Sequence, residues 1–235
     1  MDQGPRYAIY FVPARDSDLY RFGSSVLGYD CYSGEAVPQP DEFKSDADRW
    51  RRLVREPRRY GFHATLKAPF HLLPSCSEAQ LVSALHSFSG LDHAVAAIAP
   101  TIESVSDFAA VVPMQQQAAL DALAAKCATI FDAFRAPISP QQRARRVAMG
   151  LSHDQIRNLD RWGYPFMFAD FRFHMTLTGG LEAGERAEVV ATLRRVFART
   201  CGDQTIAVDR LALLKQDSAG TAFRVVSDAA LGTAR

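Results

Sequence analysis

The sequence predicts an α+β protein built as a single bilobal domain over residues 1–235, with two antiparallel-rich sheets that face a central cleft and helices outside. Two observations predict this fold. A short apolar motif with a histidine and a threonine occurs twice, and the same order of elements surrounds each copy: strand, helix, motif strand, helix, strand, strand. Each unit is roughly 110 residues long, comparable to a small domain. We therefore place lobe 1 at about residues 1–106 and lobe 2 at about residues 107–235.

The repeated motif occupies residues 62–66 (FHATL) and residues 173–177 (FHMTL). Successive side chains of a strand alternate between faces, so the histidine and threonine of each copy share one face, about 7 Å apart, and the apolar residues point into a core. Random placement of the chain's histidines and threonines would give about a quarter of one His-x-Thr match. One copy alone would be typical of a half-buried histidine in an ordinary strand. Two copies with matching flanks indicate one shared site.

The elements around the first motif follow from local patterns. Aromatic and β-branched runs predict strands, and helical apolar spacing behind a capping residue predicts helices. We expect strands at residues 6–12, 60–68 and 94–105, and helices at residues 16–27 and 77–88. Ser77 and Gln80 have the spacing of a capping box. Residues 29–46, rich in Gly, Pro and acidic side chains, predict a long loop.

The second half repeats this order. We expect strands at residues 108–112, 173–177, 204–214 and 222–226, and helices at residues 115–134 and 182–200. Ser106 and Asp107 predict a tight hairpin, and Ser152 with Gln155 predicts another capping box. The residues after 226 predict a loose tail.

Composition and charge exclude several classes of protein. The chain is 48% hydrophobic with a formal net charge of +1, so no global field favours nucleic acid or membrane. No apolar run of about 18 residues exists, and residues 1–4 (MDQG) begin no signal peptide, so we expect a cytoplasmic protein with no membrane partner. The four cysteines are scattered, which predicts reduced thiols rather than a zinc or redox motif. They are Cys31, Cys76, Cys127 and Cys201.

Two arginine-rich runs lie near the motifs. The first contains Arg49, Arg51, Arg52, Arg55, Arg58 and Arg59, and the second contains Arg143, Arg145 and Arg146. Interleaved acidic residues in the first run favour a solvated helix face. The alternative is that some of these arginines steer or clamp an anionic substrate at the mouth of the site. Lys67 has the strand parity of the first motif, which is consistent with a phosphate contact and equally with a lysine extended along the strand end.

Two facing imidazoles and two hydroxyls suit proton transfer at phosphorus. Histidine has the unperturbed pKa nearest neutrality, so one member of a pair can accept a proton while the other donates one. Threonine hydroxyls and nearby cations can hold the phosphate oxygens. The candidate catalytic residues are His63 and His174. The candidate substrate-binding residues are Thr65 and Thr176, with Lys67 and Thr178 added from strand parity.

The longer stretches 60–70 (YGFHATLKAPF) and 171–179 (FRFHMTLTG) resemble the two-histidine phosphoesterase superfamily, which includes 2′-5′ RNA ligase-like proteins and cyclic nucleotide phosphodiesterases. They are most similar to a bacterial branch associated with phosphonate-utilisation operons, and the similarity extends to residues 6–12 and 162–165. The resemblance implies a bilobal α+β fold with one His-x-Thr motif per lobe, action on 2′,3′- or 1″,2″-cyclic phosphates, and no metal or other cofactor. It implies the motif histidines as the acid–base pair and the motif threonines as phosphate ligands. The operon association implies a small ester such as a ribose cyclic phosphate.

We therefore expect a metal-independent, monomeric phosphodiesterase that opens a small cyclic phosphate ester. The main alternative is an RNA-end-processing or RNA-binding protein of the same fold that uses the arginine runs, which the near-neutral net charge makes less favoured. A metal hydrolase lacks its usual sequence signatures here. A silent binding protein would keep the cleft without turnover. The sequence leaves open which histidine is the base.

Overall fold

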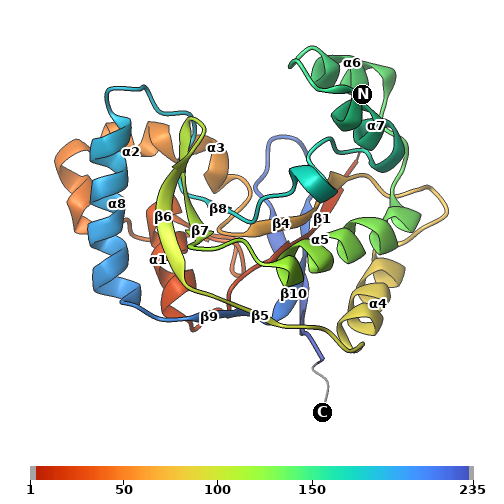
Figure 1. Cartoon of the computed structure of the whole chain (residues 1–235), viewed down its shortest axis with the longest axis horizontal. Helices are drawn as coiled ribbons and strands as arrows, with labels where there is room; N and C mark the ends of the chain where they lie inside the picture. The colour runs from red at the N-terminus through yellow and green to blue at the C-terminus, as the bar shows by residue number, and fades with distance from the viewer. Residues whose placement is uncertain (1–3, 233–235) are drawn as a thin grey trace.

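The strands of the computed structural model, which describes residues 4–232, form one large antiparallel sheet (Figure 1). Its seven strands follow the order β11-β10-β1-β4-β8-β7-β6. Their bounds are β1 (Arg6–Phe11), β4 (Ala64–Phe70), β6 (Pro100–Val105), β7 (Phe108–Pro113), β8 (Met175–Thr176), β10 (Arg210–Gln216) and β11 (Arg224–Ala230). Two short pairs lie outside this sheet: β2 (Tyr29–Asp30) with β3 (Glu35–Ala36), and β5 (Ala96–Ile98) with β9 (Ile206–Val208).

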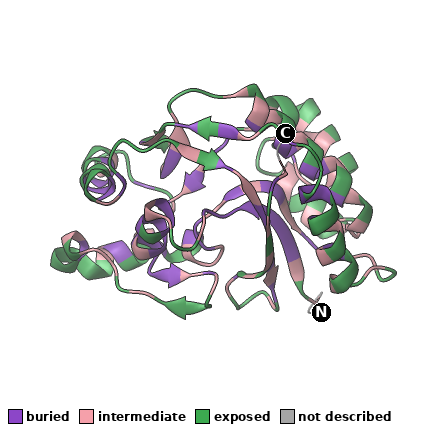
Figure 2. Cartoon of the chain, turned by 90° about the horizontal axis from the view of Figure 1, so that it is seen from below, coloured by how far each residue is buried: buried purple, intermediate pink, exposed green. Residues whose placement is uncertain are grey.

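Helices surround the sheet, which confirms the expected α+β class. The α-helices are α1 (Asp18–Leu27), α2 (Ala47–Leu53), α3 (Arg55–Arg58), α4 (Glu78–Ser89), α5 (Ala118–Ile130), α6 (Pro140–Val147), α7 (His153–Trp162) and α8 (Arg186–Cys201). Three 3₁₀ turns are η1 (Asp41–Asp46), η2 (Phe131–Phe134) and η3 (Phe168–Asp170). Figure 2 shows a buried sheet at the centre and helices whose outer faces are exposed.

Two apolar clusters bury both faces of β1. Along this strand Tyr7, Ile9 and Phe11 belong to the larger cluster, which helices α1, α4, α5 and α8 also enter. The alternate side chains Ala8 and Tyr10 belong to a smaller cluster on the opposite face. Because strand side chains alternate, each position of β1 identifies a face of the sheet. This assignment locates the motif residues below.

The strands of the two halves of the chain interleave, and this differs from the expected pair of facing sheets. The motif strands β4 and β8 are neighbours in one sheet, joined at Ala64↔Met175. Strands β10 and β11, from the end of the chain, extend the sheet beyond the N-terminal strand β1. Strands β6 and β7 pair with each other across the expected lobe boundary near residue 106. The repeat in the sequence gives an order of elements, whereas the choice of strand edges that pair depends on tertiary packing.

Several local expectations are confirmed, and others are corrected. Both capping boxes form, at Ser77 and at Ser152, and the hairpin residue Ser106 adopts a left-handed φ of 57°. The expected helix at residues 115–134 ends in the 3₁₀ turn η2, and the expected loop at residues 29–46 contains β2, β3 and η1. The expectation of a loose tail after residue 226 is wrong up to residue 230, because β11 pairs there with β10. This strand lies at the edge of the sheet, and its sequence pattern is weak. The first three residues and the last three lie outside the described range.

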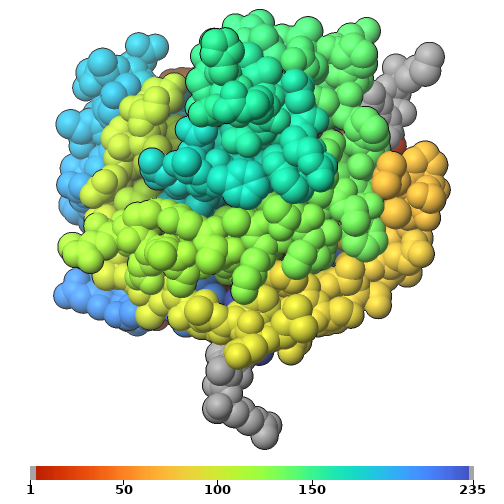
Figure 3. All heavy atoms as spheres, turned by 45° about the vertical axis from the view of Figure 1, so that its right-hand side comes forward, coloured from red at the N-terminus to blue at the C-terminus, as the bar shows by residue number. Residues whose placement is uncertain are grey.

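Residues 136–171, here called the cap, form a helical insertion between η2 and β8. Helix α6 has no buried residue and α7 buries only Leu159, so the cap adds little to the core. An ion pair between Arg143 and Asp160 at 2.5 Å joins its two helices. In Figure 3 the cap, coloured green to teal, lies directly above α5. The cap therefore covers one end of the sheet.

The described cysteines are free thiols, as expected, with Cys31, Cys127 and Cys201 buried and Cys76 half-buried. No helix within residues 4–232 combines the length and apolar character needed to cross a bilayer.

Candidate active site

The register of β4 and β8 brings the two His-x-Thr motifs together. Ala64 pairs with Met175 in antiparallel sense, and both side chains are buried in the larger core cluster. One residue to either side, His63 then lies opposite Thr176 and Thr65 lies opposite His174, on the other face of the sheet. Opposed side chains of an antiparallel pair have Cβ atoms about 5 Å apart. The two imidazoles and two hydroxyls therefore converge on one face.

His63 is held in one tautomer by a glycine turn. Its Nδ1 lies 2.9 Å from the Gly61 carbonyl oxygen, which can only accept, so Nδ1 carries the proton and Nε2 is an acceptor. Gly61 has φ of 74°, and a Cβ there would lie 2.6 Å from the Cys31 Cβ, so only glycine fits this turn. The His63 Nε2 lies 3.2 Å from the Thr65 hydroxyl, which donates to it. The imidazole stacks on the Tyr10 ring with centroids 3.7 Å apart.

Burial dominates the protonation of His63. It lowers the pKa of this imidazole to about 4, the Gly61 carbonyl opposes the change, and the charge of protonated His174 lowers the pKa further. His63 is therefore neutral at pH 7 and presents a lone pair at Nε2.

His174 has the same tautomer in a different setting. Its Nδ1 lies 2.8 Å from the Arg172 carbonyl oxygen, so Nδ1 again carries the proton. Burial lowers the pKa of His174, and the Arg172 carbonyl opposes the change. The nearest aromatic contact is tilted, with the Phe108 ring centroid 5.6 Å away.

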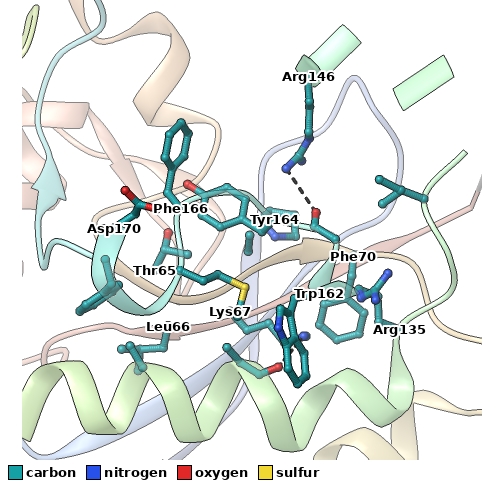
Figure 4. Close-up of a pocket in the computed structure, with 18 of the residues that line it drawn as sticks. Thr65, Leu66, Lys67, Phe70, Arg135, Arg146, Trp162, Tyr164, Phe166 and Asp170 are labelled. Carbon is teal, nitrogen blue, oxygen red and sulfur yellow. Dashed lines mark hydrogen bonds between the residues drawn. The ribbon is translucent and has the colours of Figure 1, made fainter. Parts of the chain in front are cut away.

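A cavity of about 890 Å³ lies between the sheet, α5 and the cap. Among the described residues, its lining includes Thr65 and His174 but not His63 and Thr176, so His63 reaches it through its hydrogen bond to Thr65. The lining also includes six Lys or Arg side chains and one carboxylate, that of Asp170. The basic residues are Arg6, Lys67, Arg135, Arg145, Arg146 and Arg172. A chain of net charge +1 thus concentrates positive charge at this cavity (Figure 4).

Lys67 does not share the face of Thr65. The register between β1 and β4 shifts, so Thr65 lies opposite Tyr10 whereas Lys67 lies opposite Ile9, on the other face. The Lys67 Nζ contacts the Ala128 carbonyl oxygen at 2.8 Å and Asp132 at 3.0 Å. Figure 4 shows its side chain directed toward α5. The same-face expectation is therefore wrong because of the bulge, and substrate contact by Lys67 stays a prediction.

Thr178 is fully buried at the end of β8 and does not line the cavity. Its hydroxyl accepts a hydrogen bond of 2.9 Å from the Ala109 backbone nitrogen. Strand β8 contains only Met175 and Thr176, so strand parity no longer applies two residues later. The structure thus gives Thr178 a structural contact.

The first arginine run serves surface ion pairs. Arg49 contacts Glu188 at 3.0 Å and Arg51 contacts Asp48 at 2.5 Å, and no arginine of this run lines the cavity among the described residues. This arrangement favours the solvated-face interpretation. In the second run, Arg145 and Arg146 line the cavity.

Sequence reasoning missed three tyrosines and one arginine at the site. Tyr10 covers His63, Tyr60 lies 6.2 Å from the same ring, and Tyr164 lies 5.5 Å below the Arg146 guanidinium. Arg6 is an electrostatic neighbour of Tyr10. Alternation along residues 6–12 places Arg6 and Tyr10 on one face, but only the pairing of β1 with β4 shows that this face is the motif face.

Residues 65–224 match the family described as protein of unknown function (DUF1045). The chain belongs to this family. The matched range begins at Thr65 and includes the whole second motif.

Two curated relatives of this DUF1045 protein carry the name ribose 1,5-bisphosphate phosphokinase PhnN. The protein from Janthinobacterium sp. (strain Marseille) is 35% identical over 222 residues, which cover 93% of this chain and 49% of the relative. The protein from Laribacter hongkongensis (strain HLHK9) is 33% identical over 221 residues, which cover 94% and 50%. The chain thus spans about half the length of these relatives.

Two solved structures align with nearly the whole DUF1045 chain. A phosphoesterase aligns with a TM-score of 0.42 and 13% identity, covering 97% of this chain and 99% of its own. E. coli LigT complexed with 3′-AMP aligns with a TM-score of 0.43 and 14% identity, covering 98% and 99%.

Within the described part of this DUF1045 protein, no group of three His, Cys, Asp or Glu side chains is placed to hold a metal ion. Besides one carboxylate, the polar groups that line the cavity include guanidinium groups, the His174 imidazole, the Thr65 hydroxyl and the Tyr164 phenol. Such groups bind anions and move protons.

Proposed function

We propose that this protein is a metal-independent phosphodiesterase that opens a small cyclic phosphate ester by acid–base catalysis with His63 and His174. The observation that carries the proposal is the pairing of β4 with β8 at Ala64↔Met175, which puts both motifs on one face beside a basic cavity. The fixed tautomers support it, because a backbone carbonyl occupies each Nδ1 and makes Nε2 the nitrogen that exchanges protons, at His63 in contact with the Thr65 hydroxyl.

The unequal surroundings support one division of labour. Burial lowers the pKa of both imidazoles, that of His63 to about 4, and the charge of protonated His174 opposes a proton on His63, so we take the first proton of the pair to reside on His174. We assign His63 as the base that takes a proton from water, and His174 as the acid. The water oxygen bonds to phosphorus, the ring P–O bond breaks, and the His174 proton passes to the leaving oxygen. When the attacking water replaces the Thr65 hydroxyl at His63 Nε2, Thr65 donates instead to a non-bridging oxygen, as does Thr176.

The size of the cavity and the names of the relatives support a sugar ester. A volume of about 890 Å³ lies within the range of small-molecule sites. The curated relatives are named for a phosphorylated ribose, and the notable positive charge of the cavity suits a phosphorylated ligand. We therefore favour a ribose cyclic phosphate.

A second candidate, opening of cyclic phosphates at RNA ends, is favoured by the aromatic lining. Trp162, Tyr164, Phe166 and Phe168 all line the cavity and could stack on bases. It shares the chemistry above and differs only in the group attached to the phosphate.

A turnover screen in excess chelator tests these proposals. The substrates are ribose cyclic phosphate, nucleoside 2′,3′-cyclic phosphates and an oligonucleotide ending in a 2′,3′-cyclic phosphate. The proposed function requires turnover that survives chelation and is lost in His63→Ala and His174→Ala. His86→Ala is the matched control, because His86 is exposed on α4 and bonds only Ser227. Loss of activity on chelation, or none with any substrate, contradicts the proposal.

A further inference from the structure

We infer that the cavity contains a second anion subsite, formed by Arg6 and Arg146, that binds a phosphomonoester at the far end of the substrate. The inference deepens the proposed function and rests on it for the identity of the reacting group. The preferred ligand is then a small sugar with a cyclic phosphate at one end and a phosphate monoester at the other.

Two half-buried guanidinium groups at this place have no acidic partner in the described part of the chain. Arg146 donates to the Gly163 carbonyl oxygen at 3.3 Å and lies over the Tyr164 ring. Arg6 donates through Nε to Gln216 Oε1 at 2.8 Å and lies over the Phe223 ring at 5.5 Å. Neither has a carboxylate partner among residues 4–232, whereas the cap arginines Arg143 and Arg157 and the nearby Arg135 all do.

Both guanidinium groups line the same cavity, where their charges oppose each other. Burial lowers the pKa of Arg146, the neighbouring Tyr164 opposes this change, and the charge of Arg6 adds to it. Two neighbouring like charges, partly removed from water, are unfavourable until an anion joins them. A phosphomonoester carries up to two negative charges and suits the planar donors of arginine. The empty pair is therefore complementary to such a group.

The position of Arg6 separates this subsite from the histidines. Tyr10 stacks on His63, and Arg6 precedes Tyr10 by four residues on the same face of β1, about 13 Å along the strand. The Arg6 guanidinium group bonds Gln216 of β10. Strand β10 is the neighbour of β1 on the side away from β4. One phosphate held between the motif side chains would therefore not reach this guanidinium group.

Behind the cavity lining, a series of aromatic rings links the surroundings of Arg6 to those of His63. The Phe223 ring beneath Arg6 stacks on Tyr60 with centroids 5.4 Å apart, and Tyr60 lies 6.2 Å from His63. Arg146 reaches down from the cap over Tyr164, as Figure 4 shows. A sugar ring lying in the cavity between Thr65 and Arg6, both of which line it, would place one phosphate at each end. A nucleoside cyclic phosphate would instead place a neutral base there and leave the arginine pair without an anion.

Binding of ribose 5-phosphate, a monoester with no cyclic ester, tests the subsite without turnover. By calorimetry we expect Arg146→Gln to weaken this binding by about 10- to 100-fold, the range for a hydrogen bond to a charged group. Arg146→Lys should restore part of the affinity, and the double variant His63→Ala/His174→Ala should keep most of it. Arg157→Gln is the matched control, because it removes the same charge from an exposed cap position paired within its own helix. Binding lost in the histidine variant but unchanged in Arg146→Gln overturns the inference.

Turnover of ribose cyclic phosphate with and without a 5-phosphate separates the two proposals. We expect the 5-phosphate to raise kcat/KM by about 10- to 100-fold in the wild type and in Arg157→Gln, and to have little effect in Arg146→Gln. Equal turnover of both esters by the wild type overturns the second subsite and leaves the phosphodiesterase standing. A preference for nucleoside cyclic phosphates overturns it in favour of base binding. No turnover of either ester, with ribose 5-phosphate binding still lost in Arg146→Gln, rejects the phosphodiesterase and keeps the subsite.

Discussion

The two His-x-Thr motifs have almost the same sequence and unequal surroundings. His63 precedes the seven-residue strand β4, lies against Tyr10 with ring centroids 3.7 Å apart, and bonds Thr65. His174 precedes the two-residue strand β8, lines the cavity, and meets Phe108 only at 5.6 Å. In a symmetric pair either imidazole would be equally ready to take the first proton, so neither would be fixed as the acid. The difference between the two settings is therefore what acid–base catalysis needs.

Removing either imidazole should cause the largest loss of turnover. We expect His63→Ala and His174→Ala each to lower phosphodiester turnover by about 10²–10⁴-fold, the usual worth of a general acid or base. The double variant should be little worse than either single one, because the two act as a unit. Thermal melting should stay nearly unchanged. Full activity in either single variant would refute the assigned roles.

The pH dependence of turnover should show the same asymmetry. The active free enzyme has neutral His63, with a pKa of about 4, and protonated His174, with a pKa below its usual value of 6.5. Raising the pH removes the His174 proton and lowering it charges His63, so kcat/KM should be bell-shaped with an optimum below about pH 6.5. A bound phosphate anion raises both pKa values, so the optimum of kcat should lie at higher pH. A flat profile between about pH 5 and 9 would exclude paired acid–base work.

The order of protonation can be measured directly. In an NMR titration, His174 should take up its proton at higher pH than His63. His174→Gln should then raise the pKa of His63 only slightly, because the charge of His174 contributes less than burial or the Gly61 carbonyl. His63→Gln should leave the pKa of His174 nearly unchanged, since His63 is still neutral when His174 titrates. Protonation of His63 first would reverse the assignment of base and acid.

The sequence predicted the parts of the site that depend on local pattern. His63, Thr65, His174 and Thr176 follow from period-two alternation, and the structure places them on one face. The errors arose where alternation is interrupted. A register shift between Ile9 and Tyr10 of β1 moved Lys67 to the other face, and the end of β8 left Thr178 buried.

The cap and its arginines were beyond sequence reasoning for a different reason. Arg6 and Arg146 are far apart in the sequence, and they line one cavity only because the cap lies over the sheet. Neither residue has a motif around it, and Arg146 lies beside Arg143 and Arg145 in a run typical of a solvated helix. What distinguishes Arg146 is a tertiary property, its burial over Tyr164 without an acidic partner among the described residues.

The threonine variants should have the smallest effects, and they distinguish a loss of anion binding from a loss of stability. Thr65→Val should weaken inhibition by phosphate by about 2- to 10-fold, the worth of one neutral hydrogen bond, because its hydroxyl lines the cavity beside His63. Thr176→Val should have an equal or smaller effect. Thr178→Val should leave inhibition unchanged but lower the free energy of unfolding by about 1–3 kcal/mol, since it leaves the buried Ala109 N–H without an acceptor. Phosphate inhibition assays and denaturant melts on all three variants provide the measurement. If phosphate inhibits Thr178→Val more weakly than the wild type, or inhibits Thr65→Val as strongly as the wild type, the face of the sheet that binds the anion has been assigned incorrectly.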